Sequence, residues 1–129
     1  MELPSDVKRL CESQYWSVTP TGSNYICPDN PNNDDEDFLI QIHDSEESVR
    51  FALSALTELG YDFHSSIHYQ ELANEFISFK KDKVNLIVTR SRSFADKWRA
   101  ATNICKVLNV TEKDMRIKLF RAALYNEVQ

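Results

Sequence analysis

Two carboxylates at alternate positions, Asp35 and Asp37, lead directly into an apolar run at residues 38–42. In a β-strand, residues two apart share a face, so Asp35 and Asp37 project together while Phe38 and Ile40 point into the core. Neighbouring carboxylates repel each other, and such a pair is typical of a site where a divalent cation or a proton lies between them. The alternative is a solvated acidic strand end.

A Gly-Ser pair, Gly22 and Ser23, stands about a dozen residues before these acids. It follows the aromatic and β-branched run 16–21, which predicts a strand with Pro20 at its end or on a sheet edge. A glycine after a strand permits close backbone approach to a ligand, and the serine hydroxyl and amide can hold a phosphate. Residues 25–34 are rich in Pro, Asn and Asp, which predicts a loop.

A later β-hairpin is predicted from residues 76–80 and 84–89, joined by a charged turn. Alternation places Val84, Leu86 and Val88 on one face and Asn85 on the other. A buried amide without a partner costs about 1 to 3 kcal/mol. Asn85 is therefore expected to face either a functional site or a neighbouring backbone group.

Helical spacing of apolar residues predicts four helices that support these strands. The first covers residues 5–15, with Tyr15 in its apolar stripe, and the second begins at a cap, Asp44 or Ser45, and ends at Gly60. The third is capped by Ser93. Its expected buried stripe consists of Phe94, Trp98, Ala101, Cys105 and Leu108.

The fourth helix follows residue 111 and carries four basic residues on its outward face: Lys113, Arg116, Lys118 and Arg121. These side chains either bind polyanions or form a solvated face. Residues 61–75 give little pattern beyond a short strand near 61–63. His64 and His68 fit a metal pair only on a helix, and the serines around them favour an exposed loop or a turn.

Composition indicates one globular domain over residues 1–129, with 42% apolar and 27% charged residues. No apolar run is long enough to span a membrane and no signal segment opens the chain, so we expect a cytoplasmic protein. The three cysteines are odd in number and lack metal-ligand spacing, which predicts reduced thiols.

The net charge of −5 is unevenly distributed. Residues 1–47 contain eleven acidic residues and two basic ones, whereas residues 80–129 contain twelve basic residues and five acidic ones. A basic C-terminal half suits a nucleotide or nucleic-acid partner. The alternative is that the two halves neutralise each other across one fold.

This order of elements and motifs resembles the nucleotidyltransferase superfamily of the DNA polymerase β type over about residues 5–90. The matching motifs are Gly22-Ser23 and Asp35-Glu36-Asp37, and Asn85 stands where the family has a third acid. The chain also looks like small nucleotidyltransferase-like proteins common in phage genomes. Two departures are Glu36, at a position that is usually apolar, and Asn85, which carries no negative charge.

The resemblance implies an α+β fold in which a small mixed sheet packs against helices over residues 1–90, followed by a helix pair over 91–129. It implies that Asp35 and Asp37 hold two Mg²⁺ ions on a nucleoside triphosphate and that Gly22 and Ser23 position its phosphates. With Asn85 in place of an acid, these residues form an incomplete catalytic set.

Three functions follow from the resemblance and its departures. The first is a catalytically weak or lapsed module that binds a host protein or nucleic acid. The second is an active Mg²⁺-dependent enzyme that moves a nucleotidyl group from a nucleoside triphosphate to a hydroxyl acceptor. The third is a stable fold without chemistry at these residues, in which the acids are solvated surface.

Overall fold

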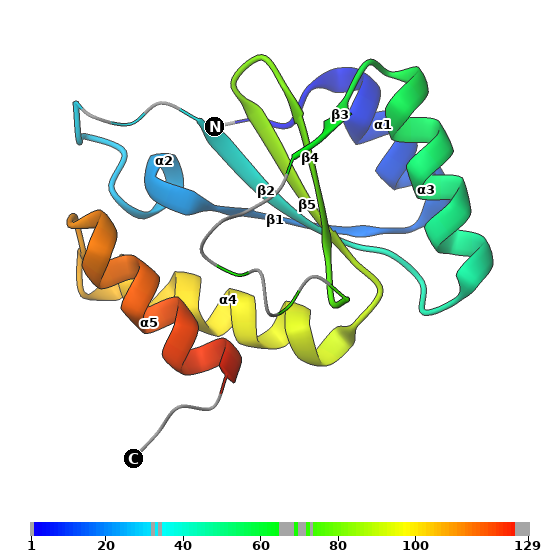
Figure 1. Ribbon diagram of the computed structural model, residues 1–129. Helices are drawn as coiled ribbons and strands as arrows, with labels where there is room; N and C mark the ends of the chain where they lie inside the picture. Colours follow the sequence, from blue (N-terminus) through cyan, green and yellow to red (C-terminus); the bar gives the residue numbers. More distant parts are fainter. Residues whose placement is uncertain are drawn as a thin grey trace.

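The computed structural model describes residues 2–31, 33, 35–64, 69, 72 and 74–125. Within them, a mixed five-stranded sheet is covered by helices on both faces (Figure 1). The strands are β1 (Ser17–Thr21), β2 (Glu36–Gln41), β3 (Asp62–Phe63), β4 (Ile77–Lys81) and β5 (Val84–Thr89). The helices are α1 (Ser5–Gln14), α2 (Gly22–Ile26), α3 (Glu46–Glu58), α4 (Arg92–Val107) and α5 (Lys113–Tyr125). The predicted α+β class and C-terminal helix pair are confirmed.

The strand order β1-β2-β5-β4-β3 places the two site-bearing strands next to each other. β2 and β5 pair in parallel, with Asp37 opposite Asn85, whereas the other pairs are antiparallel. β1 is an edge strand, which suits Pro20 because proline has no backbone N–H to donate to a neighbouring strand. The parallel register therefore brings the Asp-x-Asp segment and Asn85 together.

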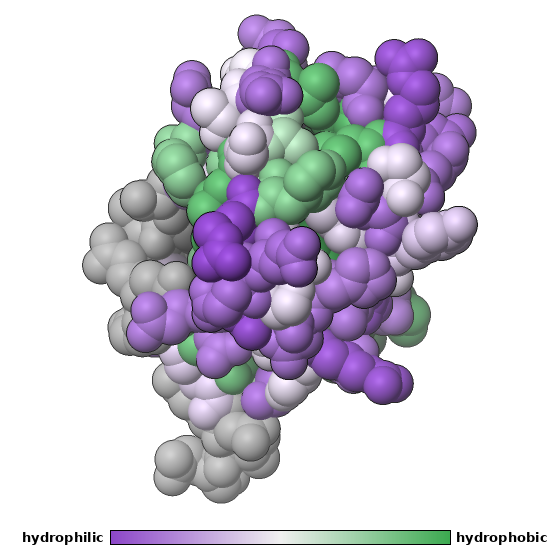
Figure 2. All heavy atoms as spheres, turned by 90° about the vertical axis from the view of Figure 1, so that its right-hand side faces the viewer, coloured by the Kyte–Doolittle hydropathy of each residue, from purple (hydrophilic) through white to green (hydrophobic). Residues whose placement is uncertain are grey.

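The two faces of the sheet are buried against different helices. Phe38 and Ile40 point into the core, as predicted, where they pack with residues of α1 and α3. Leu39, which is fully buried, packs on the other face with α4 and α5. Burial on both faces explains why β2 reads as a continuous apolar run. Figure 2, viewed from the side of α1 and α3, shows mostly hydrophilic side chains with one band of hydrophobic side chains in its upper half.

The N-terminal cap of α3 agrees with the prediction from the sequence, whereas that of α4 differs. Ser45 caps α3 by accepting a hydrogen bond from the Ser48 amide at 3.1 Å. The prediction of Ser93 as the cap of α4 is wrong, since Ser91 accepts from the Phe94 amide at 3.1 Å.

Two side chains of the predicted apolar stripes lie outside the core. Tyr15 is 87% exposed because it ends α1 in the left-handed conformation, with φ of 58°. Leu108 ends α4 and is 65% exposed. Cys11, Cys27 and Cys105 are buried free thiols, and no helix in the described ranges is long and apolar enough to cross a membrane.

Candidate functional site

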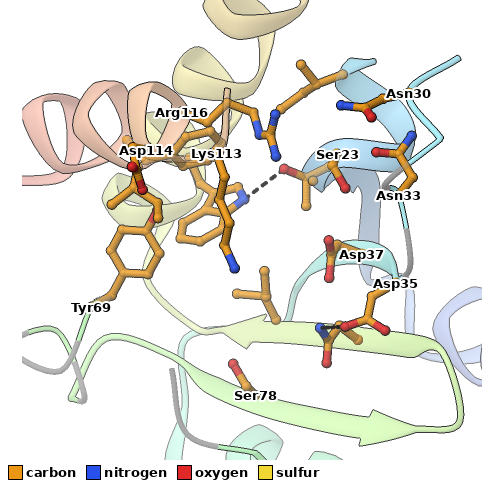
Figure 3. Close-up of a pocket in the computed structure, with 18 of the residues that line it drawn as sticks. Ser23, Asn30, Asn33, Asp35, Asp37, Tyr69, Ser78, Lys113, Asp114 and Arg116 are labelled. Carbon is orange, nitrogen blue, oxygen red and sulfur yellow. Dashed lines mark hydrogen bonds between the residues drawn. The ribbon is translucent and has the colours of Figure 1, made fainter. Parts of the chain in front are cut away.

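One cavity of about 1090 Å³ lies between the sheet and the start of α5 (Figure 3). All five residues expected from the sequence line it: Gly22 and Ser23 at the start of α2, Asp35 and Asp37 at the start of β2, and Asn85 of β5. They come from three segments far apart in the sequence. The fold therefore assembles the expected residues in one place.

Gly22 lies directly against the side chain of Asp37. A Cβ atom at Gly22 would fall 2.7 Å from Asp37 Cγ, and the backbone has φ of 76°. Only glycine adopts this left-handed conformation without cost, and only glycine leaves room for the carboxylate. The Gly-Ser turn and the acid are thus held in direct contact.

Hydrogen bonds fix this turn to α4 and to the entry of β2. Thr21 Oγ1 lies 2.7 Å from Thr102 Oγ1 and accepts from Trp98 Nε1 at 3.0 Å. Asn24 donates to the Asp35 carbonyl at 2.6 Å. The loop predicted over 25–34 is wrong at its start, because residues 25 and 26 belong to α2. That short helix brings Asn24 to the acidic segment.

Two donors meet on one carboxylate oxygen at the acidic end of the cavity. Lys80 Nζ lies 3.2 Å from Asp35 Oδ2, and Asn85 Nδ2 donates to the same oxygen at 3.4 Å. The Asn85 Oδ1 atom is buried and has no hydrogen-bond partner among the described residues. The Asn85 amide therefore borders the cavity and donates to a side chain there, and not to a neighbouring backbone group.

Burial raises the pKa of Asp37 from 3.8 to about 6. A hydrogen bond from Asn85 opposes the rise, the negative charge of Asp35 adds to it, and the positive charge of Lys80 opposes it. Desolvation thus outweighs the nearby donors. At neutral pH the folded protein therefore carries the Asp37 carboxylate mainly in its ionised form, at a cost set by its burial.

Two basic residues that sequence reasoning placed outside the site line the cavity from α5: Lys113 and Arg116. Arg116 is half-buried and donates to the Thr111 carbonyl at 2.6 Å, so its predicted outward position is wrong. Lys113 is exposed, but Figure 3 shows its side chain extending into the cavity toward the acids. Their spacing of three placed them on one face of the helix. The missing information was where that face points.

Aromatic side chains form the apolar part of the same cavity. Trp98 packs edge-on against Tyr69 and Phe120, with ring centroids 5.4 and 4.9 Å apart, and Phe76 lies beside it. A planar ligand ring can stack on such a wall while its polar part reaches the acids. His64 also lines the cavity. His68, with which it could form a metal pair only on a helix, lies outside the described residues.

The oxygen atoms at the acidic end suit one hard divalent cation. Asp35 and Asp37 supply carboxylates, and the unpaired Oδ1 of Asn85 supplies an amide oxygen. In the described part of the chain, no group of three or more His, Cys, Asp or Glu residues is placed to hold a metal. A pair of ions bridged by three carboxylates does not fit, because Asn85 is neutral and Lys80 is already bound to Asp35.

Comparison with known proteins gives little beyond this geometry. No family model matches the chain, and no curated protein matches it. Among solved structures, the chain is similar to the conserved protein GrpB from Enterococcus faecalis. The two are 14% identical over 96% of this chain and 95% of that one, with a TM-score of 0.47.

Proposed function

We propose that this cavity binds a nucleoside triphosphate together with one divalent cation, and that transfer chemistry there is weak or absent. The observation that carries the proposal is the opposition of charges across one cavity. Asp35 and Asp37 lie on one wall, and Lys113 extends toward them from the other. A polyphosphate with a bound cation has both charges needed to fill such a space.

Each part of the ligand has a matching surface. A divalent cation held by the carboxylates would neutralise phosphate charge. Gly22 lies against Asp37 and Ser23 lines the same cavity, so their amides and the Ser23 hydroxyl can donate to phosphate oxygens there. Lys113 adds a positive charge and has no ion-pair partner within the described part of the chain. The aromatic wall around Trp98 accommodates the base.

Two residues at the acidic end of the cavity, Asn85 and Lys80, argue against efficient nucleotidyl transfer. Asn85 cannot take a proton from an acceptor hydroxyl at neutral pH, and Lys80 Nζ holds Asp35 at 3.2 Å. The missing third acid is consistent with a module that binds a nucleotide and acts on another protein or on nucleic acid. The phage-type resemblance and the basic C-terminal half motivate a host protein or nucleic acid as the partner.

The second candidate function is an active Mg²⁺-dependent nucleotidyltransferase, and one observation favours it. The Gly-Ser turn and both aspartates that the resemblance implies for transfer, Gly22, Ser23, Asp35 and Asp37, line one cavity. Incubation with each labelled nucleoside triphosphate, Mg²⁺ or Mn²⁺ and a cell lysate tests this function. Label transfer that is lost in the Asp35→Ala, Asp37→Ala double variant would support it, and equal labelling by both proteins would exclude it.

The Lys113→Ala variant is expected to weaken nucleotide binding because it removes the positive charge that faces the acids. At a nucleotide concentration 100 times the dissociation constant, wild-type protein should gain about 2.7 kcal/mol of stability in thermal unfolding with Mg²⁺. We expect the dissociation constant of the variant to be about tenfold larger, which lowers that gain by about 1.3 kcal/mol at the same concentration.

Lys118→Ala is the matched control, since Lys118 is exposed on the same helix and does not line the cavity. It should retain the full stabilisation by nucleotide. Equal stabilisation of the Lys113→Ala and Lys118→Ala variants would exclude Lys113 from the site. No stabilisation of wild-type protein by any of ATP, GTP, CTP and UTP would exclude the proposed function.

A further inference from the structure

Lys80 lies where β4 passes the acidic end of the cavity. In the antiparallel register of β4 and β5 it stands opposite Asn85, and both residues donate to the same oxygen of Asp35. Its side chain is 37% exposed and that of Asp35 is 28% exposed. This pairing gives Asp35 a positive partner without any metal ion.

The neighbouring lysine shows that this position is specific. Lys81, the next residue of β4, points to the other side of the sheet, where its Nζ donates to the Leu59 carbonyl at 2.9 Å and lies 5.8 Å from the Tyr61 ring. Strand alternation therefore directs Lys80 to the acids and Lys81 away from them. Within the hairpin, the two adjacent charges have separate surroundings.

We infer that Lys80 is a built-in cation of this site, competing with metal ions for Asp35 and limiting the site to a single divalent ion. The inference deepens the proposed function and rests on it for the identity of the ligand. A metal ion that uses Asp35 Oδ2 must displace both the Lys80 ammonium and the Asn85 amide. Among the described residues, no ammonium group pairs with Asp37, so its carboxylate remains available to a metal ion. In this chain the Lys80 ammonium thus takes the place of one of the two Mg²⁺ ions that the resemblance implies.

The inference predicts that removing the ammonium tightens the binding of Mn²⁺ alone. A unit charge close to a divalent ion opposes it by enough to change affinity about tenfold even with strong solvent screening. Lys80→Met and Lys80→Gln should therefore bind Mn²⁺ about tenfold more tightly than wild-type protein, measured by electron paramagnetic resonance of free Mn²⁺. Lys80→Arg, which keeps the charge, should not. Asp35→Asn added to Lys80→Met should abolish the gain.

Lys81→Met is the matched control, because it removes the same charge from the opposite face and should leave Mn²⁺ affinity unchanged. Circular dichroism and thermal unfolding verify that each variant is folded, and the two uncharged Lys80 variants provide independent tests. Unchanged or weaker Mn²⁺ binding by both of them, or no binding by any protein at 10 mM (about the upper limit of a useful site), overturns the inference. Because no nucleotide is present, tighter Mn²⁺ binding supports the inference even if nucleotide stabilisation fails.

Discussion

The Asp37→Asn variant is expected to be more stable than wild-type protein at pH 8, by about 2 to 3 kcal/mol. Burial raises the pKa of Asp37 from 3.8 to about 6, so the folded state favours the protonated carboxyl. A rise of this size corresponds to at most about 3 kcal/mol once the carboxyl is ionised. Asparagine has nearly the same shape and no charge, so it avoids that cost.

The stability that Asp37→Asn gains over wild-type protein should increase with pH. The stabilising contribution of protonated Asp37 is fully present below about pH 4 and is lost as the pH rises through about 6. The stability difference between Asp37→Asn and wild type should therefore grow between pH 4 and pH 6 and then stay level, as measured by urea unfolding. Asp29→Asn, which removes a carboxylate from an exposed loop, is the control for the change in net charge and should leave the stability at pH 8 nearly unchanged. A variant less stable than wild type at pH 8 would contradict this reasoning.

The Trp98→Ala variant is expected to lose about 3 to 5 kcal/mol of unfolding free energy, the usual cost of truncating a buried aromatic side chain. Trp98 is 6% exposed and contacts Phe94, Phe120 and Tyr69. Its indole also donates to Thr21, the residue before the Gly-Ser turn. The loss should therefore disturb the cavity as well as the core, which urea unfolding and nucleotide stabilisation measure separately.

Phenylalanine substitutions separate the hydrogen bond from the packing. Trp98→Phe leaves part of the ring contact but removes the 3.0 Å bond to Thr21, so a loss of about 1 to 2 kcal/mol is expected. Trp16 is equally buried, at 7% exposed, and its Nε1 has no partner among the described residues. Trp16→Phe should cost less than Trp98→Phe. The opposite order would show that the Thr21 bond contributes little.

Local patterns in the sequence predicted the strands that carry the acids, because β2 and β5 are apolar, β-branched and bounded by turn residues. They did not predict that Asp37 and Asn85 stand side by side. That contact depends on parallel pairing between strands separated by α3, β3 and β4, and the pairing of strands is not a local property. The resemblance to nucleotidyltransferases provided the expectation of proximity that the pattern could not.

Lys80 and Lys113 show the same limit for the rest of the site. Each belongs to an element that was predicted, a hairpin strand and a helix. The pattern assigns no role to Lys80, and it leaves Lys113 either binding polyanions or on a solvated face. Periodicity tells which side chains share a face, but not which cavity that face borders. The position of α5 against the sheet and the register of β4 with β5 decide that.

Isothermal titration shows whether Asp35 and Asp37 bind a cation and a nucleoside triphosphate in one cavity. Each nucleoside triphosphate is titrated into wild-type protein and into the Asp35→Ala, Asp37→Ala double variant, with and without Mg²⁺. We expect wild-type protein to bind at least one triphosphate at one equivalent, binding to require Mg²⁺, and the folded double variant not to bind. Binding of equal strength by the double variant, or none by wild-type protein, would contradict this expectation.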